Sequence, residues 1–304
     1  MMSAFQQQSS GGHQQQSSGK PATGPKFNVV HRTTFIYGAP VKDSVNSLHL
    51  EPRTFPFQKT IMATIRVLPA TRLRNYADLF GNITHYFEVL QPHERLEIES
   101  RFRVVNLPLD IPAAAREAEM DCYSDAETQE RIWAYLQESR FVSRHPELWR
   151  QAIDLTRDVS KVYDRATRIM EWIHENFTYE AGSTHVSTHL EEAFAGRRGV
   201  CQDFTHVMLG LCRAIDIPAR YASGYLYNGP RDSLVGAQAS HAWPEVYLPA
   251  VGWVGFDPTN NCLADERFIK VAVGRDYDDV APIKGSYRGT AHCRLSVTVD
   301  VEKL

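Results

Sequence analysis

The stretch "GRRGVCQDFTHVMLGLCRAIDIPAR" at residues 196–220 decides the fold. Its apolar residues recur at three- and four-residue steps, which predicts an amphipathic helix. The expected buried stripe consists of Phe204, Val207, Met208, Leu211, Cys212 and Ile215. The helix is expected to begin at about Cys201, directly after a basic turn that contains glycine. A structural cysteine would lie inside the stripe, as Cys212 does, so the position of Cys201 indicates chemistry.

A thiol in the first turn of a helix lies beside backbone N–H groups that have no partner within the helix. The positive end of the helix dipole favours the thiolate there, and Arg197 and Arg198 would add to this effect if they face Cys201. The thiolate is the nucleophile, and a cysteine enzyme also needs a histidine as base and usually a third group to orient it. The alternative is an unreactive free cysteine at a helix end.

Candidate partners for Cys201 follow in "SHAWPEVYLPAVGWVGFDPT", which is typical of two strands joined by a short turn. His241 lies on the first predicted strand and Asp257 on the second. Side chains alternate between the faces of a strand, so the loop length decides whether these two meet. A loop with an odd number of residues, with Leu248 opposite Gly252, puts Asp257 opposite Trp243 and on the same face as His241. A four-residue loop would put His241 and Asp257 on opposite faces. We expect the loop with an odd number of residues.

The rest of the chain divides into three ranges. Residues 1–25 repeat "QQQSSG" and are predicted to be a disordered tail. Residues 26–110 contain short segments rich in β-branched and aromatic residues, which predict an antiparallel, sandwich-like β domain. Residues 111–304 group helices before strands, with a C-terminal strand "CRLSVTVDV" after an irregular stretch at about 262–289. The predicted fold class is therefore α+β.

One further helix is predicted within 124–177, in "KVYDRATRIMEWIHENF", with Ser160 as its N-cap. Its expected buried face consists of Val162, Ala166, Ile169, Met170, Ile173 and Phe177.

Composition excludes several classes of protein. The 304 residues carry a net charge of −3 with the two signs interspersed, which argues against a nucleic-acid binder. Five cysteines without CxxC spacing disfavour a disulfide framework or a four-cysteine zinc site. No apolar run reaches the roughly 20 residues of a membrane span, and no signal-peptide core is present, so a cytoplasmic protein without membrane contact is expected. His185 and His189 have a spacing that a metal can use on a helix, but no third ligand is evident, and neither metal nor cofactor is expected.

The quoted motifs resemble those of the bacterial-type transglutaminase-like superfamily of cysteine enzymes, whose catalytic core is papain-like. The resemblance rests on "GVCQDFTHVMLGLCRAIDIPARYASGYL", "SHAWPEVYLPAVGWVGFDPTN" and "VAVGRDYDDVAPIKGSY". In addition, "HRTTFIYGAPV", "LHLEPR" and "DLFGN" resemble the N-terminal β domain that accompanies this core. The resemblance implies that Cys201 is the nucleophile, His241 the base and Asp257 the orienting acid. Thr205 departs from the usual alanine, which should matter little.

The resemblance implies acyl transfer from an amide or peptide bond through a thioester, without a cofactor. Water as the acceptor would make the protein a peptidase or amidase, and an amine would make it a transglutaminase; hydrolysis is expected, by analogy with relatives of this architecture. A non-catalytic binding module is the other alternative, although all three triad residues are present. The backbone N–H of Cys201 is one natural oxyanion donor, and Tyr179 or Trp172 could provide another. Asp203, His206, Trp243 and Glu245 also lie in the motifs, and support of the fold is the expected role of His206.

Overall fold

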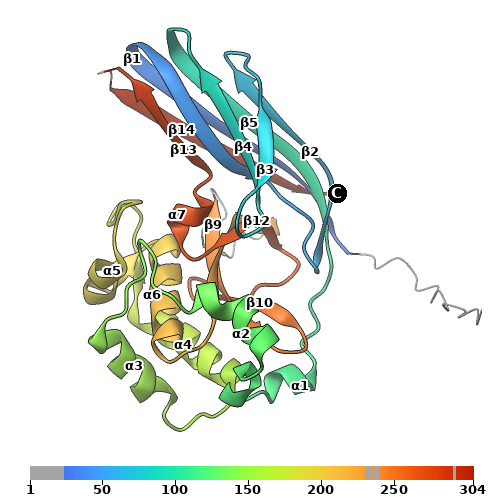
Figure 1. The fold of residues 1–304 in the computed structure, drawn as a ribbon, viewed down its shortest axis with the longest axis vertical. Coiled ribbons are helices and arrows are strands. Elements are labelled where there is room, and N and C mark those ends of the chain that lie inside the picture. Colours follow the sequence, from blue (N-terminus) through green and yellow to red (C-terminus); the bar gives the residue numbers. More distant parts are fainter. Residues whose placement is uncertain (1–23, 230–233, 236–239, 290–291) are drawn as a thin grey trace, which may run out of the picture.

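The computed structural model describes residues 24–229, 234–235, 240–289 and 292–304. Residues 1–23 of the predicted tail lie outside the described residues. A curled antiparallel sheet at one end of the molecule joins a mixed helix-and-sheet core at the other (Figure 1). The predicted α+β class is confirmed.

The first sheet is built around a single long strand. Its strands are β1 (Lys26–Glu51), β2 (Gln58–Leu68), β3 (Arg74–Ala77), β4 (Ile83–Val89) and β5 (His93–Asn106), and they lie in the order β2-β5-β1-β4-β3. The first half of β1 pairs with β5 and its second half with β4. Burial alternates along both β1 and β5, so each presents one face to a core.

Two strands from the end of the chain complete this sheet. β13 (Ile283–Arg288) and β14 (Cys293–Lys303) both pair with β1 in antiparallel fashion. The sequence analysis placed the C-terminal strand with the 111–304 range, whereas it pairs here with the first strand of the chain (Figure 1). The chain therefore leaves the first sheet, builds the core and returns to the same sheet.

The helices that the structure describes belong to the core (Figure 1). They are α1 (Ala113–Arg116), α2 (Ala126–Ile132), α3 (Pro146–Thr156), α4 (Val162–Asn176), α5 (Leu190–Gly196), α6 (Cys201–Ala214) and α7 (Tyr277–Val280), with 3-10 turns at Met120–Tyr123 and Trp133–Tyr135. Among the described residues, no helix combines the length and apolar character needed to cross a membrane.

The core sheet is antiparallel with the order β11-β10-β9-β8-β12. Its strands are β8 (Ala219–Leu226), β9 (His241–Leu248), β10 (Gly252–Asp257), β11 (Cys262–Leu263) and β12 (Phe268–Gly274). A short parallel pair, β6 (Thr178–Tyr179) and β7 (Arg198–Gly199), lies just before α6.

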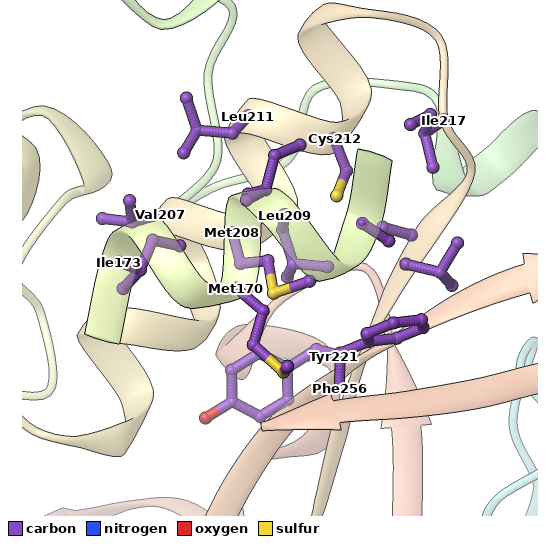
Figure 2. Packing of buried hydrophobic residues seen from close by; sticks show 14 of the residues in the cluster. Met170, Ile173, Val207, Met208, Leu209, Leu211, Cys212, Ile217, Tyr221 and Phe256 are labelled. Carbon is purple, nitrogen blue, oxygen red and sulfur yellow. The ribbon is translucent and has the colours of Figure 1, made fainter. Parts of the chain in front are cut away.

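Helix α6 is the centre of the core. It begins at Cys201 as predicted, and its predicted stripe is buried, but burial extends all round the helix from Gln202 to Arg213. Figure 2 shows why: Met170 and Ile173 of α4 pack against one side of the helix, and Tyr221 and Phe256 of the sheet lie on another. A helix enclosed in this way holds its first residue in a fixed position.

Two expectations are wrong. Ser160 does not cap α4, because Lys161 is the N-cap residue and Ser160 Oγ donates instead to Glu119 Oε1 at 2.7 Å. The predicted buried face of α4 is nevertheless confirmed. The stretch 262–289 is not irregular, since it contains β11, β12, α7 and β13. The strand β12 is buried almost throughout, so its sequence "FIKVAVG" has no alternation to reveal it.

Three buried amides join the two sheets. The Gln58 side chain bonds both backbone groups of Lys270, accepting from N at 2.8 Å and donating to O at 2.6 Å. Asn82 does the same at Val273, with both distances 2.8 Å. Asn106 donates to the carbonyl oxygens of Glu266 and Phe268. Each amide replaces bonds to water with bonds to the β12 backbone, which fixes the first sheet against the core.

Candidate active site

The turn before Cys201 is held by Asp203. Its Oδ2 accepts hydrogen bonds from the Val200 backbone N at 2.8 Å and from Thr184 Oγ1 at 2.6 Å. A Cβ at position 199 would come within 2.5 Å of this oxygen, so only glycine fits there. Burial raises the pKa of Asp203, and these two hydrogen bonds oppose the rise. The sequence placed Asp203 in the motif without indicating this positioning role.

Cys201 is therefore the first residue of α6 and is only partly buried. The backbone N–H groups of the first turn and the helix dipole favour a thiolate at this position. Thr205 Oγ1 donates to the Cys201 carbonyl oxygen at 2.7 Å, one turn along the helix. The departure from alanine at Thr205 is thus accommodated by a bond within the helix.

The β9–β10 hairpin has the predicted register. Leu248 lies opposite Gly252 and Glu245 opposite Gly255, which corresponds to a three-residue loop. His241 and Asp257 consequently share one face, and His241 Nε2 is 2.9 Å from Asp257 Oδ2. Both side chains are fully buried. The structure brings together the two residues that the loop-length argument paired.

Asp257 is held by the turn that follows it. Its Oδ1 accepts from the backbone N–H groups of Thr259 at 2.9 Å and Asn260 at 3.3 Å. Asn260 Nδ2 also donates to Oδ2 at 2.7 Å, beside the bond from His241. The carboxylate is thereby oriented toward the imidazole. Asn260 was not identified from the sequence, although "DPTN" is a turn in which an aspartate bonds the backbone two residues on.

The imidazole of His241 lies between Asp257 and Cys201. Burial alone lowers the pKa of His241, but the charge and hydrogen bond of Asp257, together with the Cys201 thiol, outweigh it and raise this pKa to about 10. Nδ1, the nitrogen that faces away from Asp257, has no well-aligned hydrogen bond within the described part of the chain. The ring stacks on Trp243, with centroids 6.0 Å apart. A charged imidazole with one nitrogen free for a thiol is what a thiolate–imidazolium pair requires.

The two arginines of the basic turn are engaged elsewhere. The Arg197 guanidinium lies over the Trp172 ring, 5.5 Å from its centroid. Arg198 is 3.8 Å from a carboxylate oxygen of Glu180. The helix terminus and His241 are therefore the positive groups that the structure places at Cys201.

Of the two side chains considered as oxyanion donors, Tyr179 is the one near the nucleophile. Burial raises the pKa of Tyr179, and the neighbouring Cys201 adds to the rise. Trp172 instead packs against Phe177 and Phe194.

The remaining histidines of the motifs have structural positions. His206 is buried and stacks on Phe141, and its Nε2 accepts from the Tyr277 backbone N at 3.2 Å. His189 is the N-cap residue of α5. Among the described residues, no group of three or more His, Cys, Asp or Glu side chains is arranged to hold a metal ion.

Comparisons with known proteins agree with this geometry. Residues 150–258 match the model of the transglutaminase-like superfamily, and residues 27–105 match the bacterial transglutaminase-like N-terminal region. An uncharacterized protein of Mycobacterium leprae is 34% identical over 294 residues, which cover 92% of this chain and 99% of that protein.

Two further proteins are similar over different extents. A protein-glutamine gamma-glutamyltransferase of Pseudomonas aeruginosa is 33% identical over 111 residues, covering 34% of this chain and 16% of that protein. The crystal structure of a proposed cysteine protease from Cytophaga hutchinsonii has the same fold, with a TM-score of 0.76 at 24% identity over 92% of this chain and 91% of that one. On its sequence and its fold, the chain belongs to the transglutaminase-like superfamily.

Proposed function

We propose that this protein is a cysteine-dependent acyl-transfer enzyme that cleaves an amide or peptide bond by hydrolysis, with Cys201, His241 and Asp257 as its catalytic triad. The observation that carries the proposal is the bond of 2.9 Å between His241 Nε2 and buried Asp257, which leaves Nδ1 available to the thiol at the start of α6. That bond fixes the tautomer and orientation of the imidazole. A cytoplasmic location remains a prediction.

The first half of the reaction forms a thioester. The Cys201 sulfur attacks the amide carbonyl carbon, and His241 Nδ1 holds the proton that left the thiol. As the tetrahedral intermediate collapses, the C–N bond breaks and His241 gives this proton to the departing amine. Asp257 stays ionised and stabilises the imidazolium. The Cys201 backbone N–H and the Tyr179 hydroxyl are the groups proposed to stabilise the oxyanion.

The second half transfers the acyl group to an acceptor. In hydrolysis, His241 takes a proton from water, the resulting oxygen nucleophile attacks the thioester and the C–S bond breaks. With a primary amine as acceptor, the same steps form a new amide. The Cytophaga neighbour is described as a proposed cysteine protease and the Pseudomonas relative as a glutamyltransferase. Transfer to an amine is therefore the second candidate.

Peptide-resolved alkylation tests the triad without knowledge of the substrate. Iodoacetamide labelling of the native protein at pH 6 should modify Cys201 first, because a free thiol with a pKa of about 8.5 is almost fully protonated there. Burial raises the pKa of each of the other four cysteines, so they serve as internal controls. His241→Ala should slow labelling of Cys201 about tenfold or more. Equal labelling of all five cysteines would favour the binding-module alternative.

Acceptor choice is tested on a protein that passes this labelling test. A mixture of glutamine-containing peptides is incubated with and without a primary amine, and products are read by mass spectrometry. Hydrolysis predicts cleaved or deamidated peptides in both samples. Products that carry the amine in place of water would replace the hydrolase proposal with the transglutaminase one.

A further inference from the structure

A pocket lies at the junction of the two sheets. It has a volume of about 520 Å³ and is lined on one side by Phe55–Gln58 of the first sheet and on the other by β9 and β10. Trp243 belongs to its wall and also stacks on His241, whereas none of the three triad residues lines it. This volume lies within the roughly 300–1,000 Å³ typical of small-molecule sites.

The floor of the pocket carries more positive than negative charge. The Glu245 carboxylate receives two cations, with Arg220 Nη2 at 2.7 Å and Lys270 Nζ at 2.6 Å. All three side chains are at least 86% buried, since the most exposed, Lys270, has 14% exposure. One carboxylate and two cations leave an excess of one positive charge. Burial lowers the pKa of Lys270, and the charges of Arg220 and Arg53 lower it too, whereas the charge and hydrogen bond of Glu245 raise it. Arg53 lies outside the pocket lining and has the Asp78 carboxylate near it.

The other charged groups of the pocket have their own partners or lie at its rim. Arg131 donates to Glu127 at 2.9 Å and to the Tyr247 hydroxyl at 3.3 Å. Asp265 pairs with Arg267 at 2.7 Å, and Glu266 is exposed. These acids do not neutralise the floor. A buried, uncompensated cation is costly, so an anion that enters this pocket would gain the charge partner that the fold does not supply.

The walls around this floor are aromatic. Lys270 Nζ lies 4.4 Å from the centroid of Phe55, and Arg220 lies 4.3 Å from that of Trp253. Phe57, Trp243 and Phe268 also belong to the apolar lining. Such a surface binds a flat or branched apolar group, because it removes apolar area from water on both sides.

We propose that this pocket binds a monocarboxylic acid with an apolar, aryl-sized body, whose carboxylate lies against Arg220 and Lys270 and whose body lies between Phe55 and Trp253. A monoanion matches the single excess charge, whereas a phosphate monoester at pH 7 carries about −1.5 to −2. The site is separate from the triad and does not depend on the reaction proposed for it.

Calorimetric titration of the unmodified protein at pH 7 and low salt tests the site. The probes are 3-phenylpropionate, the uncharged 3-phenylpropan-1-ol and 2-phenylethyl phosphate, none of which contains an amide bond. The carboxylate should bind with one site per chain, at least tenfold more tightly than the alcohol. Equal binding of acid and alcohol, or no heat with the acid at millimolar concentration, would overturn the proposal. Tighter binding of the phosphate would overturn the monocarboxylate assignment.

Lys270→Met locates the site. It removes the excess charge and leaves the Arg220–Glu245 pair neutral, so carboxylate affinity should fall at least tenfold while affinity for the alcohol changes little. Lys42→Met, an exposed lysine on β1, is the matched control and should bind as the native protein does. Unchanged affinity in folded Lys270→Met would move the ligand out of this pocket. If that variant does not fold, the acid and alcohol comparison still decides, because it uses the native chain.

Discussion

His241 and Glu245 lie on the same face of β9 with Trp243 between them, yet their surroundings differ. His241 has one charged partner, Asp257, and a second nitrogen left for a thiol. Both oxygens of Glu245 are occupied, Oε2 by Arg220 and Oε1 by Lys270. Burial and charge alone therefore do not distinguish the two residues. What sets His241 apart is an unused ring nitrogen beside the Cys201 thiol.

The largest expected effect is the loss of turnover when Asp257, the acid that bonds His241, is substituted. Asp257→Asn keeps the shape of the side chain but removes the charge that supports the imidazolium. Turnover should fall by about 10⁴-fold, the loss found when the aspartate of a Ser-His-Asp triad is changed in this way. Cys201 alkylation at pH 6 should slow in parallel.

The control for that substitution is Asp276→Asn. Asp276 is also buried, but it accepts bonds from the backbone of Phe141 and Asp278. Turnover of the folded Asp276→Asn protein should stay within a few-fold of native. If both variants lose turnover equally, charge burial in general, rather than the triad, would explain the loss.

In the cluster of Glu245, Arg220 and Lys270, a substitution should change the free energy of unfolding. Glu245→Gln leaves two buried cations without their carboxylate, which should lower the free energy of unfolding by about 3–5 kcal/mol. Urea denaturation monitored by circular dichroism measures the loss. Adding Lys270→Met to Glu245→Gln should recover part of it, because one cation is then removed. Losses that simply add would show that Glu245 and Lys270 are not coupled.

The surroundings of His241 could be predicted from the sequence, and those of Glu245 could not. The start of α6 follows from a helical period, and the pairing of His241 with Asp257 follows from alternation and a loop of three residues. Both are local patterns. Glu245 meets Arg220 across one pair of strands and Lys270 across two, and β12 itself was hidden by its continuous burial. Which strands become neighbours is a property of the topology and not of any short segment.

The amides that fix the junction were missed for a related reason. Gln58, Asn82 and Asn106 are spread along the first sheet, and all three bond the backbone of β12. Asparagine and glutamine in a strand-rich region have no periodicity that distinguishes a partner in the sheet from solvent. The pocket between the sheets could not be predicted from the sequence either, because its two walls come from segments far apart in the chain.

A smaller effect concerns alkaline stability. Since the pKa of His241 is raised to about 10 in the folded protein and is about 6.5 unfolded, the folded state holds more protons between these values. The stability that His241 contributes to the folded state is fully present below pH 6.5 and is lost as the pH rises toward 10. The free energy of unfolding should fall by roughly 3 kcal/mol between pH 6.5 and 9, and His241→Gln should fall less. Parallel pH profiles would show that His241 is not charged at neutral pH.

The smallest effect has the opposite sign and comes from His206. Burial, with help from the charges of Arg213 and His189, lowers the pKa of His206 to about 3, so between pH 3 and 6.5 the unfolded state holds more protons. Stability should therefore fall with acid, by about 2 kcal/mol from pH 7 to pH 5 for this one group. His206→Gln keeps an acceptor for the Tyr277 N–H but cannot titrate, so urea midpoints should depend less on pH than those of the native protein. The neutral buried His206 thus costs the fold stability in acid, whereas the charged His241 beside Asp257 costs it stability in base. An unchanged acid slope in His206→Gln would break that contrast.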